Sequence, residues 1–483
     1  MDTHGNYING QWTSASNGQT YQQYDPADLT KVTGSWPKST IEDTQNAIKA
    51  ADSAFTDWSE LSVYQRAEYL NRALELLKSR VDQIAKVITL ENGKMLSESK
   101  GEIQSAIVEM EFQISEGLRM AGKIMPSKQG KVLAYNIRRP LGAVSIIVPW
   151  NFPFNVPCRK VTPALISGNT CILKPANLTP GVGAEFIKLF DDAGLPMGVL
   201  NFITGSGAVV GEELVVNPAI KAISFTGSTE VGMGIEKKAA ANLTRTQLEM
   251  GGKNPLVILA DADLEAAADA AVLAAFACSG QWCTSTSRVI IEKSVESKVL
   301  DMIFQRTKKL VVGKGTDSAT TMGPVCGKSQ LTNILASIEK GKEEGAKLLL
   351  GGKQITSGEL DKGCFIEPTV FSNVSSEMHL AQEEIFGPVL SVMTAKDFDD
   401  AIRIANSVKF GLSSSIYTSN LKKAMTFIEK SDVGLTHVNI PTAYKEPQLS
   451  FGGVKLSGCG IPEGGDTGIE FFTEHKVAYI YYG

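Results

Sequence analysis

The fold is decided by the stretch Leu141-Gly-Ala-Val-Ser-Ile-Ile-Val-Pro-Trp150, an apolar run rich in β-branched residues. Shorter runs of the same kind follow it, with helical stretches such as residues 183–193 between them. These runs lie at residues 143–148, 170–173, 199–203, 222–225 and 247–248. Strand–helix–strand alternation predicts a parallel sheet with helices on both faces. We therefore expect an α/β fold whose ligands bind beyond the carboxyl ends of the strands.

The chain on either side of this region extends the pattern. Residues 40–116 are helical in character, since apolar residues recur there at three-and-four spacing. A second strand–helix series begins at Asn254, and Asp263 is placed to cap its alanine-rich helix at residues 264–278. Later strand-like runs lie at residues 288–293, 346–350, 365–371, 389–394, 413–417 and 474–483. Two α/β domains that meet in a cleft are a common architecture for cofactor enzymes.

Composition and charge exclude several classes of protein. The chain has 483 residues and a net charge of −5, from 47 Lys plus Arg against 52 Asp plus Glu, which argues against nucleic acid as a partner. No apolar run approaches the roughly 20 residues that span a bilayer, and the N-terminus resembles no secretory signal. The seven cysteines are an odd, unclustered set, so we expect free thiols in a reducing, cytoplasmic compartment.

Several common functional motifs are missing. The four histidines are widely separated, so we expect no metal site. The segment Gly205-Ser-Gly-Ala-Val-Val-Gly211 has one residue too many for a dinucleotide fingerprint, and a tight strand-to-helix turn explains it equally well.

Three residues form a candidate catalytic set. Cys283 lies in a loop after a helix and before a strand, where a thiol can be partly exposed and tuned toward the nucleophilic thiolate. Glu249 ends a strand beside two glycines, a position suited to a general base. Asn151 also follows a strand, and its amide could donate to an oxyanion. Each residue alone is ambiguous, because a packing cysteine or a structural polar group has the same sequence setting.

Seven ordered motifs together resemble the aldehyde dehydrogenase superfamily, from Tyr7-Ile-Asn-Gly10 to the end of the chain. They are Pro149-Trp-Asn-Phe-Pro153, Leu173-Lys-Pro-Ala176, Phe225-Thr-Gly-Ser-Thr-Glu-Val-Gly232, Leu248-Glu-Met-Gly-Gly252, Gly280-Gln-Trp-Cys283, Glu383-Glu-Ile-Phe-Gly-Pro388 and Ser450-Phe-Gly-Gly453. The resemblance implies two doubly wound α/β domains and a small β oligomerisation element. The NAD(P)-binding domain would comprise residues 1–120 and 141–252, the catalytic domain residues 253–467, and the oligomerisation element residues 121–140 and 468–483.

The resemblance also implies a mechanism and a cofactor, NAD or NADP. Cys283 would attack the aldehyde, Asn151 and the Cys283 backbone N–H would hold the oxyanion, and Glu249 would activate water. The family assigns Lys174 to the adenosine ribose, Ser228 to the pyrophosphate and Glu384 to the nicotinamide ribose. The remaining cofactor residues that it implies are Trp150, Asn177, Gly207, Gly227 and Phe386.

Two departures from the family pattern affect these expectations. Asn177 stands where NAD-preferring members carry a ribose-binding glutamate, so repulsion against a 2′-phosphate is removed and we predict that NADP is accepted. After Ser457-Gly-Cys-Gly460 the usual Arg-Glu pair is replaced by Ile-Pro-Glu463. We therefore assign Glu463 no role.

The substrate is the least determined feature. Arg159 occupies a position where succinate-semialdehyde and lactaldehyde dehydrogenases also carry arginine, and a guanidinium suits a carboxylate or hydroxyl. A scaffold ion pair is the alternative. Phe154, Trp282 and Tyr444 are predicted tunnel walls. The whole chain looks most like the α-ketoglutaric semialdehyde dehydrogenase branch, so we favour a short polar or acidic semialdehyde or hydroxyaldehyde.

The family implies a homo-oligomer, a dimer or tetramer, whose C-terminal strand is covered by a neighbouring subunit. Two other functions remain open at this point. A CoA-acylating aldehyde dehydrogenase is disfavoured because such enzymes generally lack Glu249. A catalytically inactive structural or binding member of the family is disfavoured by the intact motifs.

Overall fold

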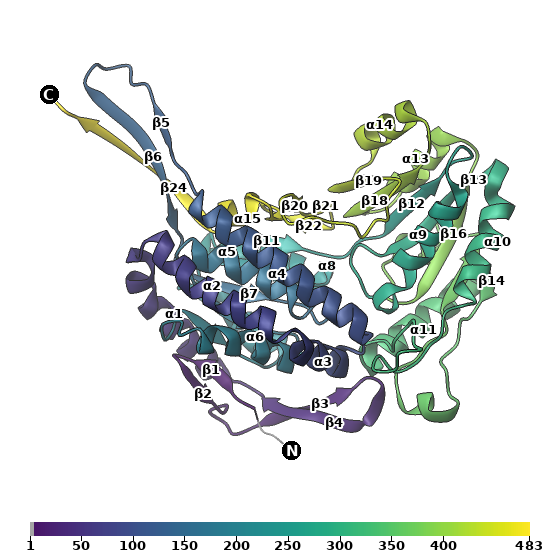
Figure 1. Ribbon diagram of the computed structural model, residues 1–483, viewed down its shortest axis with the longest axis horizontal. Helices are drawn as coiled ribbons and strands as arrows, with labels where there is room; N and C mark the ends of the chain where they lie inside the picture. The colour runs from purple at the N-terminus through teal and green to yellow at the C-terminus, as the bar shows by residue number, and fades with distance from the viewer. Residues whose placement is uncertain (1–3) are drawn as a thin grey trace.

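A large mixed sheet organises the N-terminal half of the protein. The computed structural model describes residues 4–483, so the first three residues of the predicted cofactor domain and of the N-terminal stretch lie outside it (Figure 1). The strands run in the order β2 (Gln11–Thr13), β1 (Asn6–Ile8), β9 (Leu200–Phe202), β8 (Thr170–Lys174), β7 (Ala143–Ile147), β10 (Ala222–Thr226), β11 (Arg245–Glu249) and β22 (Gly458–Cys459). The five central strands, β9 to β11, are parallel, as the alternation predicts.

Alternate residues of these strands enter two different cores, since successive side chains of a strand point to opposite faces. Val144 and Ile146 of β7 pack in one core, whereas Ile172 of the adjacent β8 packs in the other. The chain winds outward from β7 to β8 and β9, then crosses back to β10 and β11. Strand order therefore reverses between β7 and β10, where a doubly wound sheet opens a crevice for ligands.

Helices cover both faces of this sheet and confirm the helical character predicted for residues 40–116. On one face lie α1 (Ile41–Glu60), α7 (Glu212–Val216) and α8 (Thr229–Ala239); on the other lie α2 (Val63–Ser79), α3 (Val81–Asn92), α4 (Leu96–Leu118), α5 (Asn155–Ile166) and α6 (Pro180–Asp192). Helices α1 and α2 begin at capping boxes made by Thr40 with Asp43 and by Ser62 with Gln65. A β-hairpin of β3 (Thr20–Asp25) and β4 (Asp28–Pro37) precedes α1.

A second α/β unit follows directly, because β11 continues through residues 250–253 into the second sheet. Its strands run in the order β14 (Lys347–Leu350), β15 (Thr369–Ser372), β16 (Val389–Ala395), β13 (Thr286–Glu292), β12 (Asn254–Ile258), β18 (Ser413–Tyr417) and β19 (Leu435–Val438). Its helices are α9 (Leu264–Phe276), α10 (Glu296–Thr307), α11 (Lys328–Glu343), α12 (His379–Gln382), α13 (Phe398–Asn406) and α14 (Leu421–Lys430). The predicted cap is confirmed, since the Asp263 carboxylate accepts from the Ala266 N–H at 3.1 Å.

A three-stranded arm projects from the body of the molecule (Figure 1). It consists of β5 (Lys123–Met125), β6 (Val132–Pro140) and the C-terminal strand β24 (Thr473–Tyr481), which pairs with the whole of β6. Its apolar side chains are exposed in the single chain; Tyr479 is 73% and Tyr481 is 65% exposed.

The chain returns to the first unit earlier than the predicted boundary at residue 467. Strand β22 pairs with β11, and the Met250 N–H donates to the Ser457 carbonyl at 2.8 Å. Short strands β17 (Phe410–Gly411) and β21 (Val454–Lys455) pair before this point, whereas β20 (Ser450–Phe451) and β23 (Glu463–Gly464) pair across it. Helix α15 (Thr467–Phe471) packs in the first core, so only β24 of residues 468–483 belongs to the arm.

Candidate active site

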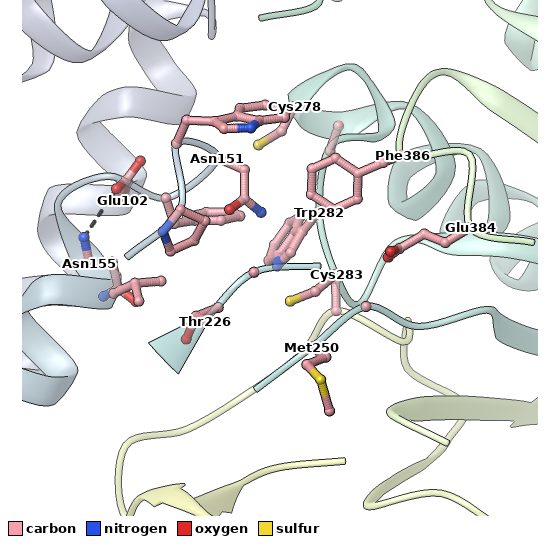
Figure 2. Close-up of a pocket in the computed structure, with 18 of the residues that line it drawn as sticks. Glu102, Asn151, Asn155, Thr226, Met250, Cys278, Trp282, Cys283, Glu384 and Phe386 are labelled. Atoms are coloured by element: carbon pink, nitrogen blue, oxygen red, sulfur yellow. Dashed lines mark hydrogen bonds between the residues drawn. The ribbon is translucent and has the colours of Figure 1, made fainter. Parts of the chain in front are cut away.

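The carboxyl edge of the first sheet faces the amino edge of the second, and a cavity of about 640 Å³ lies between them. Trp150 and Asn151 follow β7, while Gly227 and Ser228 follow β10, so the cavity opens at the point where strand order reverses. Figure 2 shows Cys283 within this cavity, between Thr226 and Glu384.

Cys283 reaches the cavity because the backbone turns sharply after α9. Cys278, Ser279 and Gly280 adopt left-handed φ values of 51°, 56° and 68°. A Cβ at Gly280 would lie 2.2 Å from the Gly387 carbonyl oxygen, so glycine is required there. Burial raises the pKa of the half-buried Cys283 thiol to about 12. The resting group is therefore a thiol, whereas the loop setting of Cys283 in the sequence would also allow a pKa lowered toward the thiolate.

The Asn151 amide is held two residues from the cysteine. The side chain is buried, and Nδ2 donates to the Gln281 carbonyl at 3.1 Å. An amide nitrogen carries two hydrogens, so this bond leaves one N–H for an oxygen in the cavity. A donor fixed in advance is what stabilisation of a developing oxyanion requires.

Glu249 and Glu463 form an unequal pair of buried carboxyls. Burial and the charge of Glu463 raise the pKa of Glu249 well above its usual range, which makes its carboxylate a stronger base than an exposed one. Glu463 is equally buried, but Lys160 and Arg159 hold its pKa below the ordinary value. Its two oxygens lie 2.7 Å from Lys160 Nζ and 2.7 Å from Arg159 Nη1. Two carboxyls with opposed pKa shifts are suited to accept and pass on a proton.

Sequence reasoning missed Glu463, because the motif after Gly460 departs from the family pattern. The structure brings it to the site through pairing of β23 with β20. A usable signal was present in Arg159 and Lys160, which are adjacent on a helix whose residues are all buried. Two neighbouring buried cations require a carboxylate nearby.

Arg159 lines the cavity, which the substrate-binding interpretation requires, and is also ion-paired, which the scaffold interpretation requires. Besides Glu463, its guanidinium contacts Glu109 at 3.9 Å and donates to Asn155 Oδ1 at 2.8 Å. It also lies 4.7 Å from the centre of the Phe451 ring. Its positive charge is thus shared with two carboxylates of the protein itself.

The structure places two of the three predicted aromatic walls at the cavity. Trp282 and Tyr444 line the cavity. Phe154 does not: it is fully buried in the first core, edge-on to Phe186 at 5.4 Å, because it precedes α5 and turns toward the helical layer. Phe152 takes the expected place and packs 5.0 Å from Trp282.

The other end of the cavity fits a nicotinamide nucleotide. Glu384 Oε1 accepts from the Gly252 N–H at 3.0 Å, and burial raises the pKa of this carboxyl to about 7. A Cβ at Gly251 would lie 1.9 Å from Glu384 Oε2, so the glycine makes room for the carboxyl. Phe386 packs edge-on to Trp150 at 5.4 Å. The buried Thr226 hydroxyl has no hydrogen-bond partner within residues 4–483, which suits a ligand.

Three predicted cofactor residues lie outside this cavity, along the same sheet edge. Lys174 ends β8; it is buried, its Nζ donates to the Pro175 carbonyl at 3.0 Å, and burial lowers its pKa to about 8. Asn177 follows, and its Oδ1 has no partner in the described part of the chain. Gly207 begins a π-helical turn after β9. Ser228, by contrast, lines the cavity. It caps α8 through a long 3.5 Å contact, which leaves its hydroxyl available to a ligand.

Neither a metal site nor a membrane span is found within residues 4–483. No group of three or more His, Cys, Asp or Glu side chains there could hold a metal ion. No helix in that range is long and apolar enough to cross a membrane.

Comparison with known proteins decides the family. Residues 12–478 match the model of the aldehyde dehydrogenase family. The chain belongs to the aldehyde dehydrogenase family. The resemblance inferred from the seven motifs is thereby confirmed, as is the expected fold class.

Similar relatives come from bacteria and archaea. An alpha-ketoglutaric semialdehyde dehydrogenase of Bacillus subtilis is 42% identical over 480 residues, covering 99% of this chain and 98% of that protein. A 2,5-dioxopentanoate dehydrogenase of Saccharolobus solfataricus is 41% identical and covers 97% of each chain. A solved structure of an NADP-dependent enzyme of E. coli superposes with a TM-score of 0.95 at 34% identity, covering 99% of this chain and 98% of that one. This aldehyde dehydrogenase therefore uses NAD or NADP to oxidise an aldehyde.

Proposed function

We propose that this enzyme oxidises a short acidic semialdehyde, 2,5-dioxopentanoate (α-ketoglutaric semialdehyde) above all, to the carboxylic acid. The observation that carries the proposal is the pair of cations, Arg159 and Lys445, in the wall of the cavity that holds Cys283. Positive charge beside a reactive thiol suits an aldehyde with a carboxylate at its other end. The names of the Bacillus and Saccharolobus relatives support the same substrate.

The chemistry assigned to this site begins at the thiol. Cys283 releases its thiol proton to solvent and Sγ adds to the aldehyde carbon; the new oxyanion accepts from the Asn151 amide and the Cys283 backbone N–H. Bound NAD or NADP supplies the acceptor for the hydride that leaves this carbon, and a thioester remains on Cys283. Ionised Glu249 then takes a proton from water, which attacks the thioester and releases the acid and the Cys283 thiolate, and the thiolate regains a proton from solvent.

The Glu249–Glu463 pair supports hydrolysis over transfer to CoA. Glu249 is buried and fixed by the Gly453 N–H, and its raised pKa makes it the stronger base of the pair. Lys160 and Arg159 lower the pKa of Glu463, so this carboxylate stays ionised and its negative charge favours protonation of Glu249 as water is deprotonated. The complete set of Cys283, Glu249 and Asn151 is likewise unexpected in an inactive family member.

The cofactor contacts, the domain division and the assembly are further parts of the proposal. Residues 4–120 and 141–252 would bind the nucleotide through Lys174, Asn177 and Glu384, with the segment from β22 to α15 added to that unit. The exposed apolar arm would join subunits into a dimer or tetramer, since an uncovered strand edge invites pairing. The cysteines of the chain form no disulfide within residues 4–483, and free thiols are typical of a reducing compartment, so we place the enzyme in the cytoplasm.

The test is a comparison of acidic and neutral aldehydes of equal length. We expect kcat/KM for 2,5-dioxopentanoate to exceed that for pentanal at least tenfold, with NADP and NAD both accepted. Equal values for the two aldehydes would refute the assignment of an acidic substrate.

A further inference from the structure

Lys445 lies in the cavity wall, and within residues 4–483 its ammonium group forms no ion pair with a carboxylate. It lies in the loop after β19, half-buried, and lines the cavity together with Asn155 and Phe451. Its Nζ donates to Asn155 Oδ1 at 3.1 Å and lies 6.0 Å from the Phe451 ring centre. Among residues 4–483 no carboxylate oxygen forms an ion pair with this ammonium group. A partly buried ammonium without an anionic partner is unfavourable until an anion binds beside it.

Arg159 differs from Lys445 in this respect. Its guanidinium contacts Glu463 at 2.7 Å and Glu109 at 3.9 Å, and a third contact goes to Asn155. An incoming carboxylate would have to compete with these fixed partners. Of the two cations in the wall, Lys445 is therefore the one that remains available to a ligand.

Asn155 fixes the position of both cations. Its Oδ1 accepts from Arg159 and from Lys445, while its Nδ2 donates to Ser105 at 3.3 Å. Its backbone N–H donates to Glu102 at 3.1 Å, which anchors the start of α5 (Figure 2). The ammonium is thus held by a rigid, buried neighbour, which lowers the entropic cost of binding an anion.

The arrangement of the cavity sets the direction of the substrate. Figure 2 shows Cys283 between Asn155 on the α5 side and Glu384 with Phe386 on the other side. The Glu384 side fits the nicotinamide, so an aldehyde that reacts at Cys283 has its distal end directed toward Asn155 and Lys445.

We propose that Lys445 is the specificity-determining residue that binds the distal carboxylate of the aldehyde, with Asn155 as its positioning residue. This inference rests on the proposed function and names the group that recognises the acidic substrate. Arg159 instead serves the buried Glu463 that assists Glu249.

A pH dependence follows for the acidic substrate only. Burial and, to a lesser extent, the charge of Arg159 lower the pKa of Lys445 to about 8, although Glu109, Glu463 and Cys283 oppose this shift. The positive charge is present below this pKa and is lost as the pH rises through it. The ratio of KM for the acidic aldehyde to KM for pentanal should therefore increase between about pH 7.5 and 9.5, because effects on Cys283 and Glu249 act on both aldehydes.

The decisive experiment compares Lys445→Met with Lys422→Met, a matched change at an exposed lysine of α14. Loss of one charged hydrogen bond should lower the 2,5-dioxopentanoate-to-pentanal ratio of kcat/KM about 10- to 100-fold in Lys445→Met only. Lys445→Arg should restore most of the ratio. By contrast, Arg159→Met should lower kcat for both aldehydes. An unchanged ratio in Lys445→Met would overturn the inference.

Two further measurements separate this inference from the proposed function. If the wild-type enzyme shows no preference for the acidic aldehyde, the proposed substrate is wrong, and inhibition of pentanal oxidation by 2-oxoglutarate still decides the role of Lys445. We expect the inhibition constant to rise at least tenfold in Lys445→Met, and an equal constant counts against the anchor. If the variant does not fold, the wild-type pH dependence decides, since a flat KM ratio across pH 7.5–9.5 contradicts it.

Discussion

Replacement of Glu249 by glutamine should separate the two halves of the reaction. The substitution keeps the size of the side chain and the oxygen that accepts from the Gly453 N–H, and it removes the ability to take a proton from water. Attack by Cys283 and loss of hydride do not use this carboxyl. The first turnover should therefore proceed in Glu249→Gln, whereas release of the thioester should not.

The magnitude follows from the position of Glu249. The Glu249 side chain is only 4% exposed, and its Oε2 has no hydrogen-bond partner within residues 4–483. This oxygen is therefore available to accept a proton from water. A positioned general base contributes about 10²- to 10⁴-fold. We expect steady-state kcat to fall by that factor, about 3–5 kcal/mol in activation free energy.

Rapid mixing with absorbance at 340 nm measures both phases. Glu249→Gln should form one equivalent of NAD(P)H per active site in a burst and then nearly stop, with the acyl group on Cys283 by mass spectrometry. Glu429→Gln, at an exposed position of α14, is the matched control and should behave as wild type. Wild-type kcat should rise with pH as Glu249 loses its proton, because only the ionised carboxylate can take a proton from water and burial raises its pKa. A slow variant without a burst, or a kcat within fivefold of wild type, would refute the assigned role.

Three other predictions follow from single residues. In the cofactor-free enzyme, iodoacetamide should alkylate Cys283 about tenfold faster for each pH unit between 7 and 9, because the pKa of its thiol is raised to about 12. Peptide mass spectrometry measures the rate of alkylation. A rate that does not change with pH above 7 contradicts a resting thiol. Asn177→Glu should lower kcat/KM with NADP more than tenfold relative to NAD, because the new carboxylate repels the 2′-phosphate. Wild-type kcat/KM with NADP below a hundredth of the NAD value would count against the prediction that NADP is accepted. Phe154→Ala should reduce the free energy of unfolding by about 3–5 kcal/mol, measured by denaturant titration, while Tyr64→Ala at an exposed position has little effect; equal effects would argue against a core position for Phe154.

The sequence predicted the sheets well, because parallel strands covered on both faces are continuous apolar runs. Residues 143–148 and 170–173 were predicted as strands and form two of the central strands, and the helical stretch predicted at residues 183–193 lies in α6. The return of residues 458–471 to the first unit was not predictable in this way. Strand β22 has only two residues, Gly458 and Cys459, and such short pairings carry no periodic signal.

At the site, the sequence identified residues by type and motif but not by the direction of their side chains. Phe152 and Phe154 are equally aromatic, yet one faces the cavity and the other packs in the core. Lys445 lies in a loop and Glu463 in the two-residue strand β23, and the position of each depends on tertiary contacts, so neither was assigned a role. Their importance follows from neighbours distant in sequence, Lys160 for the one and Asn155 for the other.

The most direct test of the central claim is the product balance of the wild-type enzyme with 2,5-dioxopentanoate. Acid and NAD(P)H should form in a 1:1 ratio without CoA, at a kcat/KM at least tenfold above that of pentanal, and Cys283→Ser should form neither. Acid formation that persists in Cys283→Ser, or a requirement for CoA, would contradict oxidation and hydrolysis at this cysteine.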